Sequence, residues 1–142
     1  MSYSLAFSQS VITVLFVADK VQQGIYDFVP TQEISDALNI PKPSAVKILQ
    51  SLNRAGIIET REGAKGGVRL AMSPLDITIL DIFNAIEQNR PLFRRDLKLG
   101  VTGKKPESGQ QAVSEVLIAA EEAMKANLKE TTIADLINKV NQ

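Results

Sequence analysis

The sequence predicts a mainly α-helical fold: a winged helix-turn-helix domain with a two-stranded β wing, followed by a long C-terminal helix. Two observations predict it. Residues 31–72 read as two short helices and then a glycine-tipped pair of strands, and residues 113–124 carry an apolar seam at helical spacing. With 142 residues, 44% of them apolar, the chain can form one compact domain and one additional element.

The first element is a helix over residues 4–23. Valines between Val11 and Val21 recur at three- and four-residue spacing, which places them on one helix face, and Gly24 supplies the end. Other apolar side chains surround the middle turns, so we expect this helix to be buried on more than one side.

A short second helix is expected over residues 32–38, followed by a turn at residues 39–40. Thr31 is a good N-cap residue for it, because its hydroxyl can accept from a first-turn N–H group. The side chains expected to face inward are those of Ile34, Ala37 and Leu38.

The third helix reaches residue 55 and ends at Gly56. Pro41 and Pro43 fit only in its first turn, where N–H groups have no partner inside the helix. Its apolar stripe consists of Ala45, Ile48, Leu49 and Leu52. Its opposite stripe is polar and basic, without an acid, and consists of Ser44, Lys47, Ser51 and Arg54. Small side chains permit close approach and cations meet phosphate, so the second stripe suits a DNA major groove.

A β-hairpin is expected next, with strands at residues 57–60 and 68–72 and a turn of three glycines between them. Gly66 and Gly67 beside Lys65 could also be read as a phosphate-binding loop. The spacing of the Walker motif is missing, however, and no helix follows. The hairpin turn accounts better for these glycines, because glycine permits positive φ and close backbone approach.

The segment after the hairpin begins with a fourth helix. Thr78 and Asp81 form its capping box, and its inward residues are Leu80, Phe83 and Ile86. Residues 89–109, with two prolines and three glycines, are either a passive linker or an effector loop. Its basic cluster of Arg90, Arg94, Arg95 and Lys98 would favour a small anionic molecule or a second protein as effector.

A long helix is expected over residues 110–129, with an apolar seam of Val113, Val116, Leu117, Ala120 and Met124. Packing within one chain and packing in a dimer both explain this seam, and we favour the dimer. Thr132 and Asp135 cap a last short helix that carries Ile133, Leu136, Ile137 and Val140.

Composition excludes several classes of function. The chain has no Cys and no His, so disulfides, thiolate nucleophiles, Ser-His-Asp triads, zinc sites and cysteine-held iron–sulfur clusters cannot form. We therefore expect that the protein binds no cofactor and is not an enzyme. There is no apolar run of membrane-spanning length and no signal-peptide pattern, so we expect a soluble cytoplasmic protein without a membrane partner.

Positive charge is concentrated locally, although sixteen basic and sixteen acidic residues cancel overall. Residues 40–70 carry six basic residues against two acids, whereas residues 1–39 carry one lysine against four acids. A local basic region is what a DNA footprint requires. The other interpretation is a small domain whose charges are merely solvated.

The chain resembles the Rrf2 family of bacterial regulators over nearly its whole length, and three stretches carry the resemblance. They are residues 40–58, with Ile40-Pro41 and the run from Lys47 to Leu52; residues 63–71, similar to the family's wing Gly-Pro-Lys-Gly-Gly-Tyr-Arg-Leu-Ala; and residues 77–87. The resemblance implies a winged-helix dimer whose long C-terminal helix crosses to the partner subunit.

The chain also departs from that family in three places. Many members hold an iron–sulfur cluster on three cysteines in the segment that is residues 89–109 here, which has none. Members of that kind tend to have Ser-Tyr-Leu-Glu early in the recognition helix, whereas this chain has Pro43-Ser44-Ala45-Val46, which resembles the cluster-free subgroup. Glu62 stands where the family has an arginine before the wing glycine, and Arg61 lies one residue earlier. Adjacent strand residues point to opposite faces, which leaves open whether Arg61 replaces that contact.

These observations predict a homodimeric transcriptional repressor that binds double-stranded operator DNA, regulated by a small-molecule or protein effector. The alternative is a winged-helix adaptor that binds a protein instead, which Glu62 and the zero net charge favour. We expect a DNA-binding domain at residues 1–88, a linker or effector loop at 89–109, and a dimerisation region at 110–142. The expected DNA-binding residues are Thr31, Gln32, Lys42, Ser44, Lys47, Ser51, Arg54, Arg61, Lys65, Gly66 and Gly67.

Overall fold

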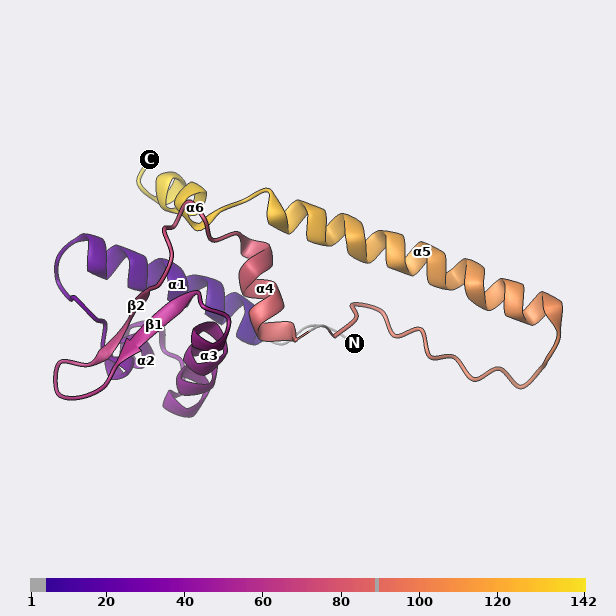
Figure 1. The fold of residues 1–142 in the computed structure, drawn as a ribbon, viewed down its shortest axis with the longest axis horizontal. Coiled ribbons are helices and arrows are strands. Elements are labelled where there is room, and N and C mark those ends of the chain that lie inside the picture. The colour runs from indigo at the N-terminus through magenta and orange to yellow at the C-terminus, as the bar shows by residue number, and fades with distance from the viewer. Residues whose placement is uncertain (1–4, 89) are drawn as a thin grey trace.

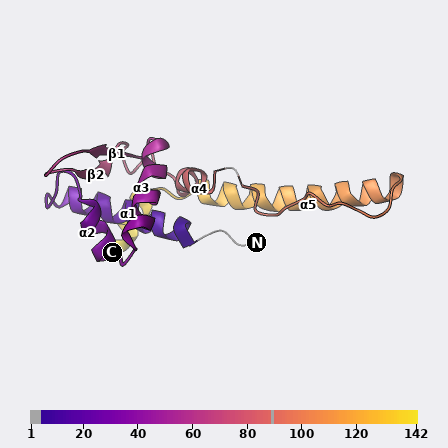
Figure 2. The same ribbon diagram turned by 90° about the horizontal axis from the view of Figure 1, so that it is seen from below.

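A computed structural model describes residues 5–88 and 90–142; Ser4 and Asn89, the expected first residues of helix one and of the linker, lie outside these ranges. A body and a projecting arm make up the fold (Figures 1 and 2). The elements are α1 Leu5–Gln22, α2 Thr31–Leu38, α3 Lys42–Arg54, β1 Ile58–Arg61, β2 Gly67–Leu70, α4 Ile79–Glu87, α5 Lys104–Lys129 and α6 Ile133–Val140. No helix in the described ranges is long and apolar enough to cross a bilayer.

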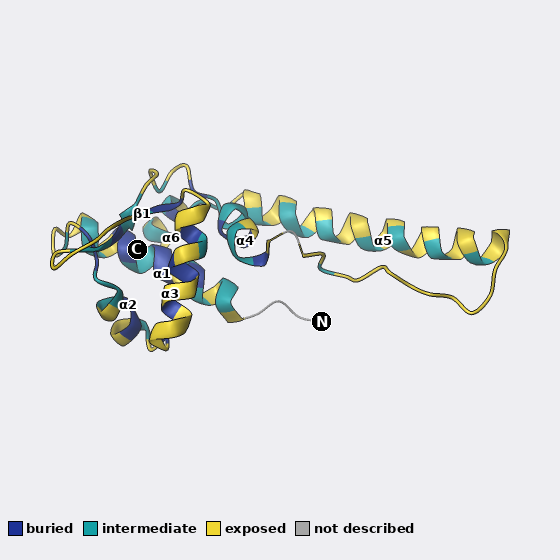
Figure 3. Cartoon of the chain, turned by 60° about the horizontal axis from the view of Figure 1, so that its bottom comes forward, coloured by how far each residue is buried: buried dark blue, intermediate teal, exposed yellow. Residues whose placement is uncertain are grey.

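Helix α1 lies at the centre of the body. Val14 and Val17 are fully buried, and the helix packs against α2, α3, α4, α6 and β2. Its buried residues form one stripe, whereas Ser8, Ile12 and Asp19 on the opposite side are exposed, so the expectation that it is buried on more than one side is wrong for the single chain. The core around it is aliphatic and includes Ile34, Leu52, Ile82 and Ile133, each without exposed surface. Figure 3 shows that buried residues gather in the body and not in the arm.

Helix α2 differs from the prediction in its N-cap and in one of its inward-facing residues. Thr31 is its first helical residue, Pro30 holds the N-cap position, and no side chain caps the helix. Ala37, expected inside, is exposed. Ser35 takes the inner position because it lies about 100° from Ile34 on the same side as Leu38. Its buried hydroxyl donates to the carbonyl of Ile40 at 2.6 Å.

The wing is an antiparallel pair, in register from Ile58 opposite Leu70 to Arg61 opposite Gly67. Its strands lie within two residues of the expected bounds. Val29, from the connection between α1 and α2, adds an isolated bridge to Val68. Its N–H donates to the carbonyl of Val68 at 2.7 Å, and the N–H of Val68 donates back to Val29 at 2.9 Å.

Helix α4 begins with the expected capping box of Thr78 and Asp81. Phe83 is buried as expected, and its ring meets that of Phe7 edge-on, with the ring centres 5.2 Å apart. Leu80 and Ile86 are only half-buried; the fully enclosed aliphatic residue of this helix is Ile82.

The arm consists of residues 90–103, which lead away from the body, and α5, which runs back beside them (Figure 1). Helix α5 begins at Lys104, six residues before the expected start, because Pro106 falls in the first turn, where proline's missing N–H is not needed. After α5 the chain returns to the body: Ile133 of α6 donates its N–H to the carbonyl of Ile77 at 2.8 Å. The expected capping box of Thr132 and Asp135 is present; Ile133 of this helix is fully buried, whereas Val140 near its end is 74% exposed.

The close approach of the wing to Val29 yields a stability prediction. A Cβ at Gly67, whose φ is +148°, would lie 2.2 Å from the carbonyl oxygen of Val29. Gly67→Ala is therefore expected to lower the free energy of unfolding by about 3 kcal/mol, measured by urea denaturation. Gly100→Ala is the control, because a Cβ there meets nothing within 4 Å. Equal stabilities for the two variants would contradict this account of the wing.

Candidate nucleic-acid interface

Helix α3 presents a broad solvent-facing surface. The four residues expected in its apolar stripe, Ala45, Ile48, Leu49 and Leu52, are all buried. At about 100° per residue, the direction opposite that stripe falls between Gln50 and Lys47, with Arg54 in line one turn later. All three are exposed. Gln50 was missed by the sequence analysis, although its spacing from Lys47 and Arg54 could have identified it.

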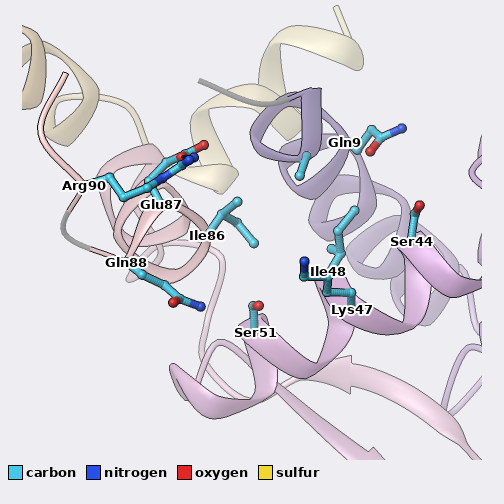
Figure 4. Close-up of a pocket in the computed structure, with 10 residues that line it drawn as sticks. Gln9, Ser44, Lys47, Ile48, Ser51, Ile86, Glu87, Gln88 and Arg90 are labelled. Atoms are coloured by element: carbon cyan, nitrogen blue, oxygen red, sulfur yellow. Dashed lines mark hydrogen bonds and ion pairs between the residues drawn. The ribbon is translucent and has the colours of Figure 1, made fainter. Parts of the chain in front are cut away.

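The expected stripe of Ser44, Lys47 and Ser51 lies along one flank of this surface. These side chains border a cleft of about 600 Å³, on whose other side are α1 and the C-terminal end of α4 (Figure 4). Ser44 and Lys47 are exposed, and Ser51 is half-buried. Three of the four residues of the predicted DNA-reading stripe therefore also line a cavity, and only Arg54 does not.

The other flank of α3 faces the wing across a second, smaller cleft of about 290 Å³. Gln50 and Asn53 from α3 line it, together with Thr31 at the start of α2 and Glu62 and Gly67 from the wing. The structure thus brings Thr31, Arg61 and Gly67, three of the expected site residues, to the same cleft as α3. Gln32 points its amide to its own helix, donating to Asp36 at 2.8 Å.

Phe28 supports the wing arginines, and sequence reasoning did not find it. The guanidinium carbons of Arg61 and Arg69 lie 4.2 and 4.4 Å from the centre of its ring, within the range of a cation–π contact. Arg61 and Arg69 lie on the same face of the wing, because Arg61 and Glu59 are two residues apart and Glu59 pairs with Arg69.

Acidic residues neutralise both of these arginines. Asp27 contacts Arg61 at 3.4 Å and Arg69 at 3.2 Å, and Glu59 accepts from Arg69 at 2.5 Å. The hydrogen bond to Glu59 is the main reason that the pKa of the Arg69 guanidinium lies above its ordinary value. The sequence showed six cations against two acids in residues 40–70. In the folded chain the positive excess around the wing is smaller, because Asp27, which lies outside that range, contacts both wing arginines.

Arg61 also stabilises the wing turn, donating to the carbonyl of Lys65 at 2.8 Å. The Gly66 N–H closes the turn on the carbonyl of Gly63 at 2.9 Å, and a Cβ at Gly66 would lie 2.3 Å from the Arg61 carbonyl oxygen. Arg61, expected to reach DNA, is thus held against the wing, while the side chain of Lys65 is exposed at its tip.

Four cations of this surface have no ion-pair partner among the described residues: Lys42, Lys47, Arg54 and Lys65. All four are exposed. They lie at the start, middle and end of α3 and at the tip of the wing. The uncompensated positive charge of this face therefore lies along the helix and the wing turn, where it can meet phosphate groups.

Two of the four cations in the basic cluster of the arm, Arg90 and Arg94, form ion pairs. Arg94 donates to Asp96, which raises the pKa of Arg94 and lowers that of Asp96, and Arg90 pairs with Glu87. The segment is also tethered to α5: the Leu92 N–H donates to Glu121, and Gln110 donates to the carbonyl of Leu97 at 3.1 Å. Residues 90–103 are thus held against α5 by hydrogen bonds at two points.

Comparison with known proteins assigns this architecture. The sequence model of the Rrf2 family, described as an iron-dependent transcriptional regulator, matches residues 3–139. A candidate HTH-type transcriptional regulator of Aquifex aeolicus is 30% identical over 114 residues, which are 78% of this chain and 76% of that protein. A Synechocystis regulator of the same kind is 33% identical over 86 residues, 61% of this chain. The aligned part spans 58% of the Synechocystis protein and 65% of a Mycobacterium tuberculosis relative.

Solved structures show the same fold at low sequence identity. A transcriptional regulator from Lactobacillus plantarum superposes with a TM-score of 0.78 at 19% identity, covering 97% of this chain and 91% of that one. CymR, the global cysteine regulator of B. subtilis, superposes with a TM-score of 0.71 at 21% identity and 98% coverage of both chains. The expected winged-helix fold is confirmed.

The family description names iron, but the donor groups of this chain do not fit it. There is no Cys or His anywhere in the sequence. In the described part of the connecting segment, residues 90–103, Asp96 is the one carboxylate, and Arg94 occupies it. Across the described ranges no three Cys, His, Asp or Glu side chains come together as a metal site.

Proposed function

This chain belongs to the Rrf2 family of transcriptional regulators, and from that premise we propose that it binds double-stranded operator DNA as a homodimeric repressor. The observation that carries the proposal is the exposed face of α3. It presents Lys47, Gln50 and Arg54 beside a wing tipped by Lys65, and no acid lies on the α3 side of this surface. Occupancy of the operator would exclude the transcription machinery.

In this proposal α3 enters the major groove, and its side chains contact bases or phosphates according to their chemistry. The amide of Gln50 can pair with adenine, which presents a donor and an acceptor side by side in that groove. Lys47 and Arg54 contact guanine or phosphate, Lys42 contacts phosphate, and the small Ser44 and Ser51 allow the helix to come close. Lys65, Gly66 and Gly67 bring the wing to the neighbouring backbone, and Thr31 and Gln32 offer first-turn N–H groups to a phosphate.

The arm supports a homodimer. Of the expected seam, Val113, Val116 and Ala120 are exposed on one side of α5, with Val113 and Val116 at 51% and 68%. Leu117 and Met124 are half-buried; together with Gln110 and Glu121 they form the face along which the connecting segment is tethered. No residue of α5 is buried in the single chain. A 26-residue helix that exposes branched apolar side chains needs a second surface, and an identical arm provides one.

Residues 5–88 and α6 then form the DNA-binding body, and the arm, residues 90–129, joins the two subunits. A dimer presents two α3 helices to successive turns of the major groove, about 34 Å apart. An effector would act by changing that separation or by altering α3 itself.

We predict that Lys47→Ala weakens binding to the DNA upstream of the chain's own coding region by about tenfold. It should also reduce the slope of log affinity against log salt by about two, because each dimer loses two cation–phosphate contacts. Fluorescence anisotropy across a salt series measures both quantities. Lys139→Ala, on the exposed end of α6, is the matched control. No specific binding by the wild type would instead favour the protein-binding adaptor.

We further predict that Asp27→Asn strengthens DNA binding several-fold and steepens its salt dependence. The substitution keeps the size of the side chain but removes the negative charge shared by Arg61 and Arg69. Glu115→Gln, which removes one negative charge from the arm, should leave affinity unchanged. Weaker binding by Asp27→Asn would show that Asp27 serves the complex by positioning the arginines.

Dimerisation is tested at the exposed side of α5. Val113→Lys combined with Val116→Lys places charge on the proposed interface without disturbing the side that faces the connecting segment, and should give a folded monomer by sedimentation. Its affinity for operator DNA should fall more than tenfold, because the two half-sites are no longer bound together. Gln111→Lys, exposed outside the seam, is the control. A double variant that remains dimeric would refute this interface.

A further inference from the structure

We propose that the 600 Å³ cleft between α1, α3 and the end of α4 binds a small carboxylic acid that also carries an amino or hydroxyl group. We propose further that this ligand and operator DNA exclude each other. The second part rests on the proposed function, because it requires that α3 reads DNA. The first part requires only the cleft.

The cleft has the size and composition of a small-molecule site. Its volume is within the range of about 300–1,000 Å³ that such sites occupy. Ala6, Ile48 and Ile86 supply an apolar floor, and the remaining lining is polar. Figure 4 shows Gln9 and Ser44 at one end, Glu87 and Arg90 at the other, and Ser51 and Gln88 between them along one edge.

Glu87 is the feature that indicates a ligand. Its side chain is only 1% exposed, and one carboxylate oxygen, Oε2, pairs with Arg90. The other, Oε1, is buried and accepts no hydrogen bond from any described residue. A buried carboxylate oxygen without a donor is costly, so native structures rarely leave one unsatisfied. A ligand N–H or O–H group in the cleft would satisfy it.

The rest of the cleft lining supplies a positive charge and hydrogen-bond donors. Lys47 has no ion-pair partner among the described residues, and the amides of Gln9 and Gln88 add further donors. These groups suit a carboxylate. A donor for Glu87 and a carboxylate for Lys47 on one small molecule define an amino acid or a hydroxy acid. The floor of Ile48 and Ile86 would accommodate an apolar part of its side chain.

Competition with DNA follows from shared residues. Ser44, Lys47 and Ser51 line the cleft and belong to the proposed DNA-binding set. A carboxylate that holds Lys47 removes a cation from the DNA surface, and a ligand seated against both serines fills the space that the groove edge would enter. By linkage, the ligand must weaken DNA binding by the same factor by which DNA weakens ligand binding.

The test uses the full chain, first without DNA. Its thermal unfolding is measured with each of the twenty standard amino acids and with lactate, malate and tartrate, at saturating millimolar concentrations. At least one acid is expected to raise Tm by about 5 °C. The same acid should raise the dissociation constant for operator DNA at least tenfold.

Glu87→Gln should abolish both responses while leaving DNA affinity in the absence of acid unchanged. If Glu87→Gln does not fold, Gln9→Leu, at the opposite end of the cleft, is tested for loss of the same two responses. Gln111→Leu on α5 is the control. The proposal fails if no acid shifts the wild type, or if the cleft variants respond as the wild type does. An acid that stabilises the chain without weakening DNA binding overturns the competition. A chain that responds to acid but binds no DNA would refute the proposed function and keep the ligand site.

Discussion

The paired backbone hydrogen bonds between Val29 and Val68 are the contact on which the arrangement of the interface depends. They fasten the wing to the connection between α1 and α2, and Gly67 permits the approach because it has no side chain. Phe28, adjacent in sequence, is thereby placed beneath Arg61 and Arg69. The small cleft between α3 and the wing, and the exposed position of Lys65, both follow from that attachment.

The charge of the interface is set by tertiary structure more than by sequence. Asp27 is distant from the wing in sequence but contacts both wing arginines, so they stabilise the hairpin and contribute less to its field. The uncompensated cations then lie along α3 and at the wing tip. A chain with no net charge can in this way present a positive surface, and the rest of the chain then carries the matching excess of negative charge.

Features governed by local chemistry were predictable from the sequence. The capping boxes at Thr78 and Thr132 and the apolar stripe of α3 depend on residues within one or two turns, and the structure contains them. The position of Thr31 and the ion pairs of Asp27 depend on what the chain packs against, so periodicity could not supply them. The early start of α5 was within reach of local rules, because proline is tolerated in the first turn of a helix. Gln50 was within reach of helix geometry. The buried Glu87 was not, because a glutamate at the end of an amphipathic helix ordinarily lies in water.

The position of Glu87 connects the two parts of the molecule. It ends α4, one turn before the arm leaves the body, and pairs with Arg90 at the base of the connecting segment. The cleft it lines is walled on the other side by α3. Helix α5, with no buried residue of its own, packs against α4 and is tethered to the connecting segment. A ligand held in this cleft would therefore contact the proposed DNA-reading helix directly and the proposed dimer arm through Arg90, which makes the cleft the place where a single small ligand could alter both.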